Sequence, residues 1–157
     1  MSENRKSAVL ILADGTVYRG VSFGAAGTVF GEIVFTTGVS GFQETLTDPS
    51  NFGQIVVQTF PSVGGYGVNK DDYASDRCHL SGYVVRGVTE LPSNYKMTET
   101  LGQFVTEQGV VGIEDVDTRA ITRLSICRLP SILISGKREL TTAFTVSLNS
   151  VSMSFLS

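Results

Sequence analysis

Short apolar runs separated by glycine-containing breaks fill the first ninety residues, and this pattern restricts the chain to a mostly β fold. The runs cover residues 8–12, 16–23, 31–37, 54–60 and 80–89. They are rich in Val, Ile, Thr and aromatic residues, which are enriched in strands. The glycines between them favour turns and bends over continuous helix. We therefore expect each run to form a strand.

Two turns in this part are predicted from their residue types. Asp14-Gly15 joins the first two runs and is typical of a two-residue hairpin turn, in which both positions need positive φ. Residues 42–46 are compatible with one helical turn. Asp48-Pro49 then ends that turn, because the residue before proline avoids the α region.

The apolar period changes near residue 98, where two helices are expected. Thr98 is a candidate cap for a helix with Leu101, Phe104 and Val105 on its buried face, and Gly109 ends this helix as a C′ residue.

A short buried strand at 110–113 precedes the second helix. Asp117 is the expected cap of that helix, which begins at Thr118 and has Ile121 and Leu124 on its inner face. Mostly strand with about two helices is an α+β fold class.

The last part of the chain, residues 125–157, lacks this clear patterning. It contains eight serines, shows only partial alternation over 146–156, and includes Pro130, which is expected to break the second helix. We therefore expect residues 1–124 to form one domain and 125–157 a divergent tail. The loss of pattern favours a frameshifted reading frame, and the alternative is a truncated paralogue with its own C-terminus. A tail that leaves the sheet unfinished would expose an unpaired edge strand and make the isolated chain prone to aggregate.

Length, charge and hydropathy exclude several classes of protein. The 157 residues suit a single domain, and a net charge of −3 argues against a general nucleic-acid binder. No apolar run approaches the ~18 residues of a membrane span, and the polar N-terminus does not resemble a signal peptide. We expect a cytoplasmic protein with no membrane partner.

Catalytic and metal-binding residues are not evident in the sequence. His79 is the one histidine and follows Cys78, but adjacent residues in an extended segment point to opposite faces. A pair between His79 and Cys127 is geometrically open but has no further support. Two cysteines and one histidine are too few for a zinc site. The glycines at 64–67 lack the lysine and serine of a phosphate-binding loop.

Two acidic groups have structural interpretations. In residues 114–117 the expected role of Asp117 is to cap the helix, where its charge also meets the helix dipole. Glu44 near Asp48 could form a metal or acid–base pair, but without a third ligand turn stabilisation is favoured.

The sequence contains a Thr-Asp-Pro-Ser block at 47–50 after Gly-Phe-Gln-Glu, followed about seventy residues later by Asp-Thr-Arg at 117–119. With these motifs in this order, residues 8–124 resemble the N-terminal domain of the small subunit of glutamine-dependent carbamoyl-phosphate synthetase. The matching segments are 12–15, 31–35, 37–41, 43–50, 54–56, Pro61, Gly67, Ser93, Asn94, 115–119 and Leu124.

The resemblance implies a swivelling β/β/α domain that docks on the large subunit. The family's small subunit also contains a glutamine amidotransferase domain with a Cys-His-Glu triad, which this sequence lacks. That domain supplies ammonia for carbamoyl phosphate, a precursor of arginine and pyrimidines. ATP and magnesium are expected only in the large subunit. The chain alone is therefore expected to be an inactive part of a ligase, with the large subunit, and a separately encoded glutaminase if one exists, as its partners.

The resemblance also implies roles for particular residues. Ser50 occupies the position of a serine that contributes to the glutamine site from across the domain boundary. After Pro49 fixes the backbone, a hydroxyl with one donor and two acceptor sites suits an amino or carboxylate group. The alternative is a plain turn or cap serine. Asp48, Pro49, Asp117 and Arg119 are expected to be structural or interface residues.

Two other functions remain open. The chain could be an independent binding module that kept the fold without the pathway role. A stand-alone hydrolase is a third reading, which the lack of a plausible catalytic triad disfavours.

Overall fold

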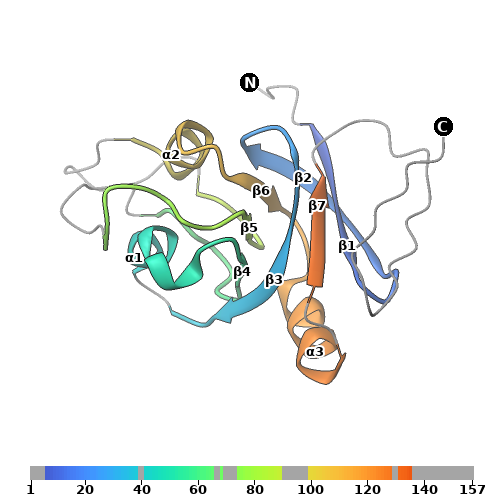
Figure 1. The fold of residues 1–157 in the computed structure, drawn as a ribbon. Coiled ribbons are helices and arrows are strands. Elements are labelled where there is room, and N and C mark those ends of the chain that lie inside the picture. Colours follow the sequence, from blue (N-terminus) through green and yellow to red (C-terminus); the bar gives the residue numbers. More distant parts are fainter. Residues whose placement is uncertain are drawn as a thin grey trace.

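The computed structural model describes residues 6–38, 41–65, 68, 74–89, 99–128 and 131–135, with the backbone only for 125–128 and 131–135. Within these residues the strands form a closed barrel in the order β1-β2-β6-β5-β4-β3-β7 (Figure 1). The strands are β1 (Ser7–Leu12), β2 (Val17–Gly24), β3 (Thr28–Thr36), β4 (Ile55–Gln58), β5 (Gly82–Val84), β6 (Val111–Glu114) and β7 (Ser131–Ser135). The helices are α1 (Phe42–Thr47), the 3₁₀ helix η1 (Pro49–Asn51), α2 (Leu101–Glu107) and α3 (Thr118–Arg128).

The barrel combines parallel and antiparallel pairing. Strands β3, β4, β5 and β6 are parallel to their neighbours in that series, whereas the pairs β1–β2, β2–β6, β1–β7 and β3–β7 are antiparallel. Parallel neighbours require crossover connections, and α1 with η1 links β3 to β4 while α2 lies between β5 and β6. This arrangement confirms the α+β fold class. No helix in the described part of the chain is long and apolar enough to cross a membrane.

Apolar side chains are buried on both faces of the central parallel strands. In β4, Ile55 and Val57 belong to the cluster inside the barrel, while Val56 belongs to a second cluster under α1 and α2. In β5, Val84 faces the inner cluster and Tyr83 the outer one. Strands buried on both sides read as continuous apolar runs. Each such side chain contributes roughly 1.5–3 kcal/mol on burial.

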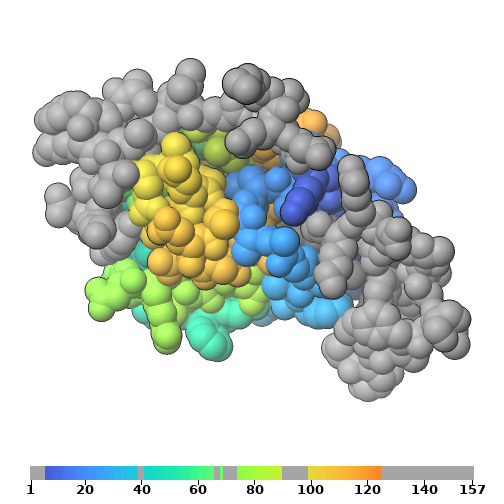
Figure 2. All heavy atoms as spheres, turned by 90° about the horizontal axis from the view of Figure 1, so that it is seen from above, coloured from blue at the N-terminus to red at the C-terminus, as the bar shows by residue number. Residues whose placement is uncertain are grey.

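Helix α2 covers the outer cluster, as the apolar spacing predicted. Leu101, Phe104 and Val105 are buried, and Gly109 has the positive φ expected after the helix. The cap is Thr100, whose hydroxyl accepts from Gln103 N–H at 3.3 Å while the Gln103 side chain accepts from Thr100 N–H at 3.0 Å. The predicted cap, Thr98, lies outside the described residues. Figure 2 shows α2 in yellow beside the blue β2 segment, which it contacts.

The first hairpin forms, but its turn is longer than the two residues predicted. Gly15 N–H donates to Leu12 O at 2.9 Å, and Leu12 N–H donates to Thr16 O at 2.9 Å. Gly15 has φ of 85°, whereas Asp14 is not among the residues with positive φ. Asp14 instead accepts from Thr16 N–H at 2.8 Å, which is the main cause of its lowered pKa. The side-chain hydrogen bond stabilises a turn in which only glycine enters the left-handed region.

Helix α3 closes one end of the inner cluster. Ile121 is fully buried there, but Leu124, which was predicted on the same face, is 37% exposed. Three residues advance a helix by about 300°, so Leu124 falls at the edge of the face that contacts the barrel. The helix runs to Arg128, and Pro130, which was predicted to break it, lies outside the described residues.

Strand β7 comes from the region predicted to be a divergent tail. It pairs with β1, where Leu12 is opposite Ile132, and with β3, where Glu32 is opposite Ser131. Both neighbours are therefore paired, and the unfinished sheet on which the expected aggregation depended does not form at this position. Residues 136–157, including the alternating segment 146–156, lie outside the described residues.

Truncation before β7 should abolish cooperative folding. A chain ending at Arg128 would leave both β1 and β3 with unpaired backbone groups, which promotes association. A chain ending at Ser135 retains β7 and is the matched control. We expect a single cooperative thermal transition and a monomer for the longer chain, and loss of both for the shorter one, measured by circular dichroism and light scattering. Equal stability of the two chains would contradict the role of β7.

Replacing Tyr83 by phenylalanine should stabilise the protein. Tyr83 is fully buried, and its hydroxyl has no hydrogen-bond partner in the described part of the chain. Burial also raises its pKa. Removing an unsatisfied buried hydroxyl should raise the free energy of unfolding by about 1 kcal/mol, measured by urea denaturation. Tyr18→Phe is the control, because Tyr18 is only partly buried and its loss of a hydroxyl should change little. A destabilised Tyr83→Phe protein would indicate a partner for the hydroxyl.

Candidate functional site

The segment predicted to carry the glutamine contact is a tight turn between α1 and β4. Phe42 and Leu46 are buried on the inner side of α1. Asp48 then adopts an extended conformation with ψ of 119°, as expected before Pro49, which starts η1. The structure thus extends the single helical turn predicted at 42–46 by one residue and ends it at the predicted proline.

Asp48 holds Ser50 through the cap of η1. Its Oδ1 accepts a hydrogen bond from Ser50 N–H at 2.8 Å. Hydrogen bonding from the Ser50 backbone, then from its side chain, lowers the pKa of Asp48. Pro49 and Ser50 are exposed. Ser50 is therefore presented to solvent on a turn that is fixed by proline on one side and by a carboxylate cap beneath it.

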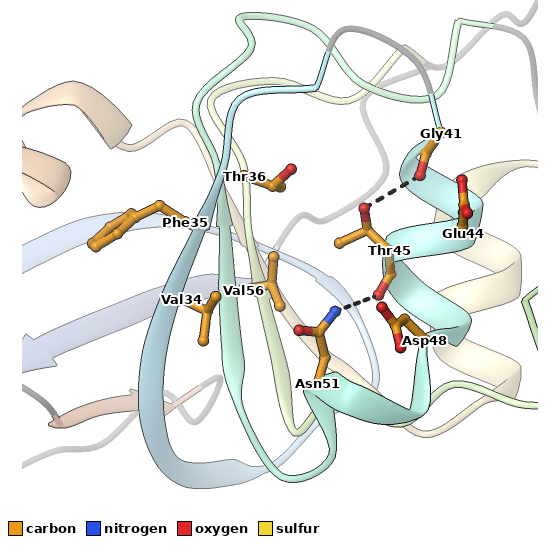
Figure 3. Close-up of a pocket in the computed structure, with 9 residues that line it drawn as sticks. All are labelled: Val34, Phe35, Thr36, Gly41, Glu44, Thr45, Asp48, Asn51 and Val56. Atoms are coloured by element: carbon orange, nitrogen blue, oxygen red, sulfur yellow. Dashed lines mark hydrogen bonds between the residues drawn. The ribbon is translucent and has the colours of Figure 1, made fainter.

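A cavity of about 320 Å³ lies beside this turn, between β3 and α1 (Figure 3). Asn51 Nδ2 donates to Thr45 O at 3.0 Å, and Thr45 Oγ1 donates to Gly41 O at 3.2 Å. Glu44 and Asp48 both border the cavity, so it offers acceptors to an ammonium or amide group. Ser50 is not part of its lining. The lining residues are Val34, Phe35, Thr36, Gly41, Glu44, Thr45, Asp48, Asn51 and Val56.

The residues predicted at 117–119 lie in a different place. Asp117 Oδ1 accepts from Arg119 N–H and Ala120 N–H, both at 3.1 Å, which is the geometry of a helix cap. Arg119 is exposed. Figure 1 shows helix α3, which starts at Thr118, apart from helix α1. An exposed cation there is available to a partner surface.

Cys78 and His79 do not form a catalytic pair. The His79 ring Nε2 lies 2.8 Å from Ser75 Oγ, and Cys78 N–H donates to Gln108 Oε1 at 3.1 Å. Burial raises the pKa of the Cys78 thiol to about 12, which disfavours the nucleophilic thiolate at neutral pH. The side chain of Cys127 lies outside the described residues.

A metal-binding group is also lacking among the described residues. No group of three or more His, Cys, Asp or Glu side chains among them could hold a metal ion. Glu114 is buried, and its Oε2 accepts from Val88 N–H at 3.1 Å. In the glycine-rich loop, residues 66 and 67 are not described.

Sequence reasoning missed the side chains that surround the turn. Asn51 and Thr45 belong to short elements without a readable period, and Ser75 and His79 come from an irregular segment. Cys78 and His79 were considered as a catalytic pair because they are adjacent in the sequence. In the structure His79 instead contacts residues at both ends of the Ser50 turn. Nothing in local spacing could indicate these contacts, because they depend on how distant segments pack.

The family model and the individual relatives that match this chain all describe carbamoyl-phosphate synthase small chains. The family described as carbamoyl-phosphate synthase small chain, CPSase domain, matches residues 10–126. The carbamoyl phosphate synthase small chain of Streptomyces coelicolor is 53% identical over 120 residues, which cover 76% of this chain and 32% of that protein. The small chain of Thermus thermophilus is 49% identical over 123 residues, which cover 78% of this chain and 32% of that protein.

A plant relative shows the same partial coverage. The chloroplastic carbamoyl phosphate synthase small chain of Oryza sativa is 51% identical over 116 residues, which cover 74% of this chain and 26% of that protein. The chain thus spans about a third or less of the length of these relatives. With a family match over most of its own length, the chain belongs to the carbamoyl-phosphate synthase small chain family and carries its CPSase domain.

Proposed function

We propose that this chain is the docking domain of a carbamoyl-phosphate synthase small chain. In this role it binds the large chain and supports the supply of glutamine-derived ammonia for carbamoyl phosphate, in arginine and pyrimidine biosynthesis in the cytoplasm. Ser50 contributes a hydroxyl to the edge of the glutamine site. ATP and magnesium belong to the large chain, and the residues proposed here supply no bond-breaking chemistry.

The family match carries this proposal. It extends from residue 10 to residue 126 and includes the whole crossover from β3 to β4 with the Ser50 turn. The exposed position of Ser50 supports its proposed role, because a hydroxyl that is buried within the domain could not reach a substrate held by another domain. Its capped, proline-fixed turn limits the conformational entropy that would be lost on binding.

An independent binding module is the second candidate. The observation that favours it is the closure of the barrel by β7, which lies at 131–135 and therefore after the end of the family match. A domain that completes its own sheet can fold without the rest of a small chain. The two candidates differ in whether the large chain is a partner.

Association with the large chain tests the docking role. The purified 157-residue chain should bind a carbamoyl-phosphate synthase large chain with a stoichiometry of one to one by titration calorimetry. Bovine serum albumin in place of the large chain is the control for non-specific association. A folded chain that shows no heat of binding and no complex by light scattering would favour the independent module.

Replacing Ser50 by alanine tests its contact with glutamine. For this experiment residues 1–126 are joined to the remainder of a relative's small chain and assembled with the large chain. We expect the KM for glutamine to rise about tenfold, the equivalent of about 1.4 kcal/mol for one lost hydrogen bond, while ammonia-dependent activity is unchanged. Ser7→Ala is the matched control, because Ser7 is also exposed and lies at the start of β1. An unchanged KM in the Ser50 variant would remove Ser50 from the site.

A further inference from the structure

The segment that contains His79 crosses both ends of the Ser50 turn. His79 N–H donates to Leu46 O at 3.2 Å, in the last turn of α1. Gly53 N–H, just after η1, donates to His79 O at 3.0 Å. The backbone of His79 therefore bonds to Leu46, before the turn, and to Gly53, after it.

The same segment is fixed to Thr47, the last residue of α1. Ala74 N–H donates to Thr47 Oγ1 at 2.8 Å, and Thr47 Oγ1 donates to Gln43 O at 2.7 Å. Ser75 Oγ lies 2.6 Å from Thr47 O. Thr47 is fully buried, so these bonds satisfy its polar groups away from water.

A count of protons assigns the donor in the contact between His79 and Ser75. The Ser75 hydroxyl has one hydrogen, and its shortest contact is the one to Thr47 O at 2.6 Å. It is 3.1 Å from Arg77 O and 2.8 Å from His79 Nε2. When the hydroxyl donates to Thr47 O, it can only accept from the ring. In that arrangement His79 Nε2 is the donor, and the ring is linked through Ser75 to the carbonyl that precedes Asp48.

The other end of the turn lies beside the same ring. The centroids of the His79 and Phe52 rings are 6.5 Å apart, with an angle of 53° between the ring planes. Phe52 is 75% exposed, so few other described residues contact its side chain. The imidazole thus contacts residue 52 directly and residue 47 through Ser75, and the four residues between them include Ser50.

We infer that His79 is a positioning residue for Ser50. Its ring fixes the two ends of the turn through a hydrogen-bond relay and an aromatic contact, and so sets the direction of the Ser50 hydroxyl. The backbone bonds of residue 79 do not depend on its side chain and would be lost only with proline, which has no N–H, whereas the relay needs a donor at the position of Nε2. A role of these His79 contacts in glutamine binding rests on the proposed function, whereas the contacts themselves do not depend on it.

The test uses the pKa of the Asp48 carboxylate as a reporter of turn geometry. Hydrogen bonds from Ser50 are the main cause that lowers this pKa, and the charge of His79 contributes less. A displaced turn should therefore raise it towards the ordinary aspartate value. The side-chain carboxyl carbon of Asp48 can be followed by nuclear magnetic resonance in the 157-residue chain, without glutamine or the large chain.

Three variants separate positioning from charge. Ser75→Ala breaks the relay but keeps the imidazole, and we expect it to raise the pKa of Asp48. His79→Gln keeps a donor near Nε2 but removes the charge, and we expect it to leave that pKa close to the wild-type value. His79→Leu should raise the pKa of Asp48 as Ser75→Ala does. A protein with both Ser75→Ala and His79→Leu should show no higher pKa than His79→Leu alone, because both changes break the same relay.

The opposite pattern would overturn the inference. If His79→Gln raises the pKa of Asp48 and Ser75→Ala does not, His79 acts through its charge alone. A second measurement, of the ring nitrogen signals of His79 in the unmodified chain, tests the inference even if the variants fail to fold. Because His79 is the one histidine, its ring nitrogen signals need no assignment by mutation. At pH values where the ring is neutral, we expect hydrogen on Nε2, and hydrogen on Nδ1 would also reject the inference.

Failure of the proposed function gives a different result. If Ser50→Ala leaves the KM for glutamine unchanged in the assembled enzyme while the relay variants behave as expected, His79 still positions the turn, and only the link to glutamine is lost.

Discussion

The burial of β4 and β5 on both faces is the constraint on which the rest of the structure depends. Ile55 and Val57 fill the barrel, while Val56 and Tyr83 require cover from outside. Apolar surface on the outer face is stable only under another element, so α1 and α2 must cross it. The crossover through α1 then has to reverse direction before β4, and the Ser50 turn is that reversal. The candidate site is therefore a product of how the core is covered.

Local patterns predicted much of the fold because the features that they report are local. The strands of the first ninety residues, the buried face of α2, and the stop at Pro49 follow from side-chain periodicity and backbone restrictions. Two predictions, the two-residue turn at Asp14-Gly15 and the burial of Leu124, were wrong for physical reasons. Asp14-Gly15 forms a longer turn in which the aspartate side chain bonds to the backbone. Leu124 is 37% exposed because it lies at the edge of the helix face that carries the buried Ile121.

The surroundings of the candidate site were beyond such reasoning. The turn itself could be located from Asp48 and Pro49, but the residues that hold it come from positions 74–79, where no period exists. Single hydrogen bonds between segments about thirty residues apart, such as the one from Ser75 to Thr47, leave no trace in composition or spacing. Strand β7 was missed for a similar reason, since five residues after a proline do not reveal their partners.

The position of β7 also determines when the domain can become complete during synthesis. Strand β1 is synthesised before the other described strands, but one of its two neighbours, β7, is the last of them. Pairing between such distant segments carries a large loop-closure cost and is intrinsically slow. Until then β1 has one open edge and β3 another. These open edges persist until β7 has been made, by which time the other described strands have already been synthesised, and unpaired strand edges favour aggregation.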